Sequence, residues 1–343
     1  MMKSISVFAF LLFFPVSMGF SQEIREIKDD IGYCWSLAQM DRIIEYVRED
    51  TIASEGTQFI AGISPHDDYL YAARVYYPLF RRIKTKEVVI FGVTHATVRK
   101  EIGDPQNVLI FDDYSGWRGI RKPIRVSGLR EYIIKNLDTT YYRISNRAHE
   151  LEHSIEGMLP FLEYFNPDVR ITPIMVTAMP FSRADEVSSA LADVILGYIK
   201  VNNIRLGDDI FFLISADANH YGKDFNNIPF GVDSTAHRTG VNNDVRLIKE
   251  VLISEITDKK IDFFMQEMKN VVWCGKYSIP MGLLTTKKVA EHMGKMEIWG
   301  ELLRYSDTYS EGVLPIHDHG MGITAPFSLK HWVGFFSAGY YMK

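Results

Sequence analysis

Two apolar runs constrain the fold of this chain most strongly. Glu87–Val93 reads Glu-Val-Val-Ile-Phe-Gly-Val, and Asp209–Ser215 contains Ile-Phe-Phe-Leu-Ile-Ser. Runs without polar alternation are typical of strands buried on both faces, as in sheets whose strands are joined by helices. The runs Phe59–Ser64 and Val169–Val176 repeat the pattern. The sequence therefore predicts an α/β fold: a single domain with a central, largely parallel or mixed sheet and helices on both faces.

Segments with helical spacing alternate with these runs. Ser36–Asp50 places apolar residues on one helical face, and Ser36 is suited to cap that helix. Further helices are expected over Tyr69–Ile83, Ile155–Phe165, Ile256–Val271 and Met281–Met293, a closing strand over Trp332–Tyr341, and a hairpin or an excursion over the sheet in Val98–Ser127.

The first 22 residues have the pattern of a secretory signal peptide. Lys3 precedes the apolar stretch Ile5–Phe20, and small residues stand before an expected cleavage after Gln22. The stretch is short for a membrane span, which needs about 20 apolar residues. We expect an exported protein, periplasmic or secreted, with no stable membrane insertion after cleavage and a mature domain over Glu23–Lys343. An uncleaved anchor is the alternative.

Charge and cysteine content exclude some classes of protein. The formal net charge is −5 and no long Lys/Arg block occurs, so nucleic acid is not expected as a partner. Cys34 and Cys274 are the two cysteines, too few for a disulfide-built scaffold. The sequence leaves open whether they pair or whether Cys274 ligates a metal.

Polar side chains follow the ends of three predicted strands. His66 and His95 each follow an apolar run, and Asp217 and His220 follow a third. In α/β sheets, ligands bind at the carboxyl ends of the strands, so we expect these side chains to converge. Two histidines in equivalent positions on neighbouring strands, together with nearby carboxylates and a thiol, indicate a metal site.

His149-Glu150-Leu151-Glu152-His153 matches the H-E-x-x-H pattern of zinc proteases. No third ligand follows at a recognised spacing, and Pro160 stands close behind. We therefore predict that this segment is not a zinc-protease helix, that His153 faces the pocket and that His149 lies outside it.

Taken in order, several motifs resemble those of the Memo family, also known as AmmeMemoRadiSam system protein B. The resemblance covers nearly the whole mature chain. It is carried by Gly32-Tyr33-Cys34-Trp35, Ile63-Ser64-Pro65-His66-Asp67-Asp68-Tyr69, Phe91-Gly92-Val93-Thr94-His95, Glu152-His153-Ser154-Ile155-Glu156 with Leu159-Pro160-Phe161, Ser215-Ala216-Asp217-Ala218-Asn219-His220-Tyr221-Gly222 and Cys274-Gly275. Asp67-Asp68 departs from the Ala-Gly pair of the family and adds negative charge beside His66.

The resemblance implies a fold shared with extradiol ring-cleaving non-haem iron dioxygenases. It implies His66, His95 and Cys274 as metal ligands, and His220 as the acid/base. Glu152 or Asp217 would orient an imidazole by accepting a hydrogen bond from the ring nitrogen that does not bind the metal. The expected pocket residues are His153, Asp67, Asp68 and Tyr69.

The first functional hypothesis is a metal-binding redox protein or enzyme that uses iron, alternatively copper or zinc, with a small-molecule or peptide ligand. A non-catalytic protein that binds a peptide or small ligand in the same pocket is the second. A zinc metallohydrolase is the third. Elemental analysis, followed by His66→Ala and Cys274→Ala, separates the first two.

Overall fold

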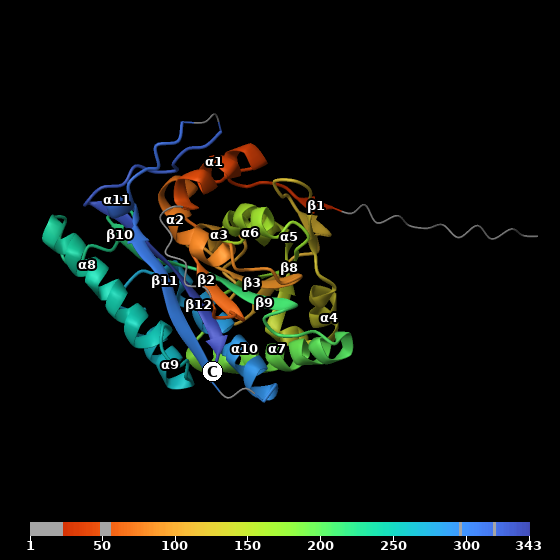
Figure 1. Ribbon diagram of the computed structural model, residues 1–343. Helices are drawn as coiled ribbons and strands as arrows, with labels where there is room; N and C mark the ends of the chain where they lie inside the picture. The colour runs from red at the N-terminus through yellow and green to blue at the C-terminus, as the bar shows by residue number, and fades with distance from the viewer. Residues whose placement is uncertain (1–22, 49–55, 295–296, 318–319) are drawn as a thin grey trace, which may run out of the picture.

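In the part of the chain that the computed structural model describes (residues 23–48, 56–294, 297–317 and 320–343), twelve strands form one mixed sheet (Figure 1). The predicted signal peptide and the end of the predicted Ser36–Asp50 helix lie outside these residues. The centre of the sheet is parallel, in the order β8 (Arg170–Val176), β3 (Glu87–Gly92), β9 (Ile210–Ser215) and β2 (Ala61–Ser64). Each of these strands coincides with one of the four apolar runs, so the predicted α/β class is confirmed.

Antiparallel strands extend the sheet on both sides. Beyond β2 lie β12 (His331–Met342), β10 (Asp217–Gly222) and β11 (Ile298–Asp307). At the other end lie the short strands β1 (Ile24–Arg25), β4 (Leu109–Phe111), β5 (Gly116–Trp117), β6 (Ile124–Val126) and β7 (Tyr142–Ile144). Of the two alternatives for Val98–Ser127, the hairpin is confirmed, because β5 and β6 form an antiparallel pair. The excursion over the sheet is wrong, because β4 and β6 both pair with β8 and widen the sheet.

Helices cover both faces of the sheet (Figure 1). One layer contains α1 (Leu37–Val47), α2 (Tyr69–Phe80) and α6 (Leu159–Phe165), and the opposite layer contains α4 (Gly128–Asn136), α7 (Phe181–Asn202), α9 (Asp258–Glu267) and α10 (Ser278–His292). The remaining helices are α3 (Ala96–Glu101), α5 (Asn146–Leu151), α8 (Ser234–Leu247) and α11 (Thr308–Glu311). None of the described helices combines the length and apolar character needed to cross a membrane.

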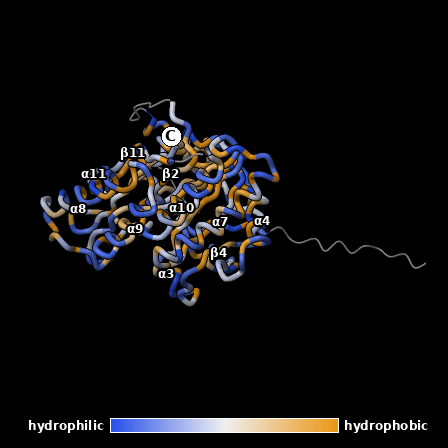
Figure 2. The backbone as a smooth tube through the Cα atoms, turned by 90° about the horizontal axis from the view of Figure 1, so that it is seen from below, coloured by the Kyte–Doolittle hydropathy of each residue, from blue (hydrophilic) through white to orange (hydrophobic). Residues whose placement is uncertain are grey.

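The two-sided burial of the central strands explains their apolar sequences. Along β3, Val89 and Phe91 pack in the core beneath α7 and α10, whereas Val88 and Ile90 pack in the core beneath α1, α2 and α6. Successive strand side chains point to opposite faces, so a strand between two helical layers needs apolar residues at every position. Figure 2 shows the corresponding hydrophobic stretches in the interior and hydrophilic ones around α3 and α8 at the periphery.

Local signals set several helix boundaries. The hydroxyl of Ser36 accepts a hydrogen bond from the backbone N–H of Gln39, which confirms the predicted cap of α1. Helix α10 begins at Ser278 and includes Pro280 in its first turn, where proline is tolerated, so it starts earlier than predicted. The long helix α7 was not predicted; it ends before Asn203, which adopts a left-handed conformation with φ 50°.

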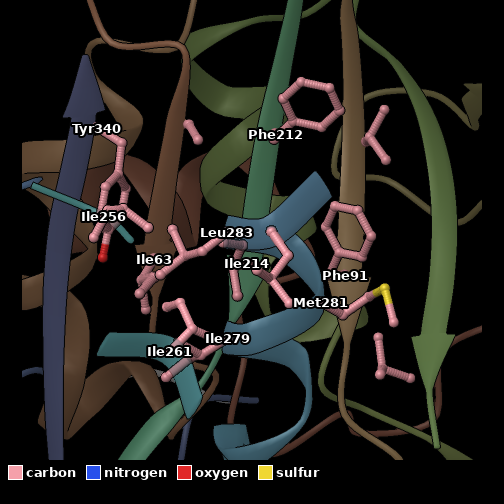
Figure 3. Packing of buried hydrophobic residues seen from close by; sticks show 14 of the residues in the cluster. Ile63, Phe91, Phe212, Ile214, Ile256, Ile261, Ile279, Met281, Leu283 and Tyr340 are labelled. Atoms are coloured by element: carbon pink, nitrogen blue, oxygen red, sulfur yellow. The ribbon is translucent and has the colours of Figure 1, made fainter. Parts of the chain in front are cut away.

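Helix α10 approaches the sheet closely at Gly282. A Cβ atom at this position would lie 2.6 Å from Cδ1 of Ile214 and 3.2 Å from Cδ2 of Phe91. Figure 3 shows the α10 side chains of Met281 and Leu283 beside these two strand residues. The backbone contact at Gly282 therefore fixes the distance between α10 and the strands that lead to the site.

We expect Gly282→Ala to lower the free energy of unfolding by about 1–3 kcal/mol, because overpacking outweighs the helix propensity of alanine. Gly197→Ala in α7 is the matched control, since its Cβ would meet the movable hydroxyl of Tyr132 at 2.9 Å. Urea denaturation measures both variants. A Gly282→Ala protein as stable as wild type would contradict this account of the packing.

Candidate metal centre

The side chains predicted to converge do so where three parallel strands end. His66 follows β2, His95 follows β3 and Asp217 follows β9. The two histidine-bearing strands are not neighbours, as the sequence analysis assumed, because β9 lies between them. The loops after the strands nevertheless bring Nε2 of His66 within 3.4 Å of Nε2 of His95.

A hydrogen-bond chain fixes the tautomer of the buried His66. Its Nδ1 lies 2.8 Å from Oγ of Ser215, and that hydroxyl donates its proton to the carbonyl oxygen of Ser154 at 2.6 Å. Ser215 can therefore only accept from His66, so Nδ1 carries the proton. The lone pair of Nε2 is left facing the group of donors. Burial, together with nearby His95 and His153, lowers the pKa of His66 and keeps the ring neutral.

His95 is oriented by the buried carboxylate of Glu152. Nδ1 of His95 lies 2.7 Å from Oε1, and the backbone N–H of His95 donates to Oε2 at 2.9 Å. Oε1 also accepts from the backbone N–H groups of His153 and Ser154. Burial alone would raise the pKa of Glu152, but its contacts with His95 hold that pKa well below its ordinary value. The ionised carboxylate thus fixes a proton of His95 on Nδ1, as behind many metal-bound histidines. Burial lowers the pKa of His95, but the charge of Glu152 and its hydrogen bond outweigh burial and raise this pKa. The neutral ring, which metal binding requires, has a bare Nε2.

Asp217 and Cys274 add an oxygen and a sulfur donor. Oδ2 of Asp217 lies 3.3 Å from Nε2 of His66, and Sγ of Cys274 lies 3.6 Å from the same nitrogen. Burial raises the pKa of Asp217 to about 7 and raises that of Cys274 well above its usual value. A bound cation would reverse both shifts, because it favours the carboxylate and the thiolate.

Among the described residues, two overlapping groups could hold a metal ion. They are His66, His95 and His153, and His66, Asp217 and Cys274; within each group the ligand atoms lie within 4.8 Å of one another. The predicted set of His66, His95 and Cys274 therefore spans both groups, with His66 common to them. Of the two residues predicted to orient an imidazole, Glu152 or Asp217, Glu152 bonds His95, and Asp217 stands among the potential ligands.

The donor set fits a transition-metal ion. Two ligands bound at about 2.1 Å in tetrahedral geometry are separated by about 3.4 Å, close to the separations around Nε2 of His66. When both rings are neutral, the two Nε2 lone pairs that face each other cannot hydrogen-bond and repel, and a shared cation removes this repulsion. Imidazole, carboxylate and thiolate together suit iron, copper or zinc, so the donors indicate a metal without selecting one.

A cavity of about 470 Å³ opens onto this centre. Its polar wall contains His95, His153, His220 and Cys274, and its apolar wall includes Val93, Val176, Phe225, Val272 and Tyr277. The His153 ring stacks on that of His95, with centroids 4.7 Å apart. Nδ1 of His220 donates to the carbonyl oxygen of Ala218 at 3.0 Å, which leaves Nε2 for other partners. Burial lowers the pKa of His220 to about 4, so its ring is neutral at pH 7.

Three predicted pocket residues lie elsewhere than on the wall of this cavity. Oδ1 of Asp67 accepts from the backbone N–H of Asp68, and burial with nearby Asp217 raises the pKa of Asp67. Oδ2 of Asp68 accepts hydrogen bonds from the backbone N–H and the hydroxyl of Thr324. The buried hydroxyl of Tyr69 donates to the carbonyl oxygen of Gly157 at 2.7 Å. Of the predicted pocket residues, the structure places only His153 on the cavity wall.

The H-E-x-x-H match does not form a metal-binding helix. Helix α5 ends at Leu151, before His153. His149 is fully buried, and its Nε2 donates to the carbonyl oxygen of Ile110 at 3.0 Å. Glu150 accepts from the hydroxyl of Tyr114. The expectation that His153 faces the pocket and His149 lies outside it is confirmed.

Two supporting residues were missed in the sequence. Ser215, which orients His66, is one. The other is Arg25 on β1, whose guanidinium donates to the carbonyl oxygens of His149 and Glu152 and pairs with Glu156. Arg25 thereby holds the 149–156 segment from a position far away in sequence. Arginine at such a position has no local signal, because its partners are backbone groups and a distant acid.

The two cysteines carry thiols and are not joined in a disulfide. Sγ of the buried Cys34 lies 3.2 Å from Sδ of Met321, in the core beneath α1 and α2. Cys274 starts a short 3₁₀ turn beside the metal group. The question that the sequence left open is thus answered in favour of a thiol beside His66.

Comparison with known proteins agrees with the family resemblance that the sequence motifs indicate. A family model described as Memo-like protein matches residues 33–312. The chain is 28% identical to a MEMO1 family protein of Saccharolobus islandicus over 235 residues, 66% of this chain and 70% of that protein. It is 32% identical to a MEMO1 family protein of Pyrobaculum arsenaticum over 48% of this chain and 55% of that protein. With a Pyrococcus abyssi relative the identity is 25%, over 79% and 87% of the two chains.

We expect Glu152→Gln to weaken metal binding about 10- to 100-fold, because the amide cannot accept from all the donors that fix His95. Glu150→Gln, two residues away and partly exposed, is the matched control and should bind metal like wild type. Isothermal titration calorimetry of the metal-free proteins gives the affinities. A larger loss in Glu150→Gln than in Glu152→Gln would revive the zinc-protease interpretation.

Proposed function

Because this chain belongs to the Memo-like protein family, we propose that it binds a redox-active metal ion, iron or alternatively copper, beside a pocket for a small molecule. The observation that carries the proposal is the pair of bare Nε2 atoms of His66 and His95, 3.4 Å apart, with Asp217 and Cys274 alongside. Each imidazole is held in the metal-binding tautomer by a separate buried hydrogen bond. Such preorganisation is expected of a ligand set and not of a structural core.

His66 and His95 would hold the ion, and Asp217, Cys274 or His153 would complete its ligands. When bound, an iron or copper ion would supply one-electron chemistry to a molecule in the adjoining cavity. The carboxylate of Glu152 keeps the His95 ring in place. The Ser215 hydroxyl does the same for the His66 ring.

His220 is the group suited to accept a proton from a bound molecule. It lines the cavity, its Nδ1 proton is committed to Ala218, and its pKa of about 4 leaves Nε2 unprotonated at pH 7. It would thus begin as a base and return the proton afterwards. The apolar residues opposite it would exclude water and position the body of the molecule.

A redox role is also suggested by the Memo resemblance, which implies a fold shared with extradiol non-haem iron dioxygenases. Two imidazoles and one carboxylate are the ligand types of many non-haem iron oxygenases, and His66, His95 and Asp217 provide them. The thiol of Cys274 is an additional donor that also suits copper. We further propose, from the signal-like Met1–Gln22, that the protein is exported and acts in the periplasm or outside the cell.

To test the metal function, we expect anaerobically purified protein to bind about one iron or copper ion per chain, and His66→Ala to lose at least about tenfold in affinity. His292→Ala, an exposed histidine at the end of α10, is the matched control and should bind like wild type. Elemental analysis and titration calorimetry provide the measurements. Full metal binding by His66→Ala would contradict the proposal.

Nitric oxide then separates a redox site from the alternatives. The iron(II)-loaded protein should give the electron paramagnetic resonance signal of an iron–nitrosyl complex, because the cavity leaves the ion accessible. A metal-loaded protein that gives no such signal would favour the non-catalytic binding protein. Exclusive uptake of zinc with hydrolysis of peptide or ester substrates would favour the metallohydrolase.

A further inference from the structure

The cavity beside the metal centre carries an excess of positive charge on its wall. Arg99 from α3 and Lys276 from the turn after Cys274 both line it, and Asp224 is the one acid among the described residues of that lining. His95, His153 and His220 also line the cavity, and the count of charges here includes only Arg99, Lys276 and Asp224.

Arg99 is held near the metal group without a full set of hydrogen bonds. Its Nε lies 3.8 Å from Oδ1 of Asp104, beyond hydrogen-bond distance, and this buried nitrogen has no hydrogen-bond partner in the described chain. The backbone N–H of Arg99 donates to the carbonyl oxygen of His95 at 2.9 Å, which places Arg99 one helical turn from this ligand. The Arg99 side chain as a whole is 27% exposed and donates no hydrogen bond in the described chain, so its guanidinium is available to a ligand in the cavity.

Lys276 is the second cation of the wall. Its Nζ lies 4.9 Å from the centroid of the Tyr277 ring, and no ion pair joins it to another residue in the described part of the chain. Lys276 also lines a neighbouring cavity of about 920 Å³, which shares Val272, Trp273 and Tyr277 with the first. It therefore stands at the boundary where the two cavities adjoin.

The remainder of the wall is suited to an apolar body. Val93, Val176, Phe225 and Val272 line the cavity, and its volume of about 470 Å³ lies within the range of small-molecule sites. A ligand that matches this wall has an apolar body and a single charged group. Two cations against one carboxylate give the described lining one positive charge in excess, before any metal ion is counted, and this favours an anionic group over a neutral one.

We propose that the pocket binds a largely apolar small molecule with one carboxylate, which Arg99 holds by charge-assisted hydrogen bonds and Lys276 attracts as a second cation. This inference rests on the proposed function, because it names the class of molecule that would lie beside the metal. Arg99 and Lys276 are assigned to recognition, and His220 remains the group that moves the proton.

The test uses pairs of probes that differ in charge and not in shape. Benzoate, 3-phenylpropanoate and hexanoate are titrated into the iron(II)-loaded full chain beside their neutral amides, with adipate as the dianion that matches hexanoate in length. We expect a carboxylate of this set to bind at least about tenfold more tightly than its amide, the effect of one charge-assisted hydrogen bond. Arg99→Gln should remove most of that preference and Lys276→Gln part of it, while affinity for the amide stays within about twofold.

Lys269→Gln is the matched control, because Lys269 lines only the larger neighbouring cavity. It should keep the full preference for carboxylates. Equal binding of carboxylates and amides, no measurable binding of any carboxylate, or an unchanged preference in both Arg99→Gln and Lys276→Gln would overturn the inference. Tighter binding of adipate than of hexanoate would overturn the assignment of a single carboxylate.

Metal content, measured on the same samples, distinguishes this failure from failure of the proposed function. If the chain takes up metal and shows no charge preference, the substrate inference alone falls. If the chain takes up no metal, the proposed function falls, and the same titrations of the metal-free protein still decide whether Arg99 selects carboxylates.

Discussion

The site depends on one buried carboxylate, that of Glu152. It accepts hydrogen bonds from Nδ1 and the backbone N–H of His95 and from the backbone N–H groups of His153 and Ser154. A carboxylate with this many donors stays ionised despite its burial. The same residue therefore fixes the loop after β3, the segment that carries His153, and the tautomer of His95. The carbonyl oxygen of Ser154 accepts a hydrogen bond from the hydroxyl of Ser215, and this hydroxyl orients His66. The position of Glu152 therefore also affects the orientation of His66.

The arrangement around His66 is unfavourable for folding in the absence of a cation. Two imidazole lone pairs face each other, an acid is buried beside them, and the Cys274 thiol is desolvated. Rigid surroundings compensate: the central strands are packed on both faces, and α10 contacts β9 directly at Gly282. Unfavourable polar contacts at the end of a strand are expected of a functional site when a well-packed apolar core holds them in place.

Elements that depend on a local sequence pattern could be predicted from the sequence. Features that depend on the pairing of strands or on distant contacts could not. Strands β2, β3, β8 and β9 were predictable because burial on both faces requires continuous apolar runs. Strand β10 was not, because its polar residues Asp217–Gly222 become a strand only by pairing with β12. His66 and His95 were identified as converging, yet the strand between them could not be read from the chain. Asp217 as a potential ligand and Arg25 as a support depend on contacts across more than a hundred residues.

The tautomers of His66 and His95 in the metal-free protein test the central claim most directly. Long-range ¹H–¹⁵N correlation spectra of histidine-labelled protein, assigned with His66→Gln and His95→Gln, identify the protonated nitrogen of each ring. In spectra recorded at a pH above the raised pKa of His95, the structure predicts the neutral Nδ1–H form for both rings, with a bare Nε2 whose resonance shifts when zinc is added. A neutral Nε2–H form at either ring, or Nε2 resonances that zinc leaves unchanged, would contradict a preorganised metal centre.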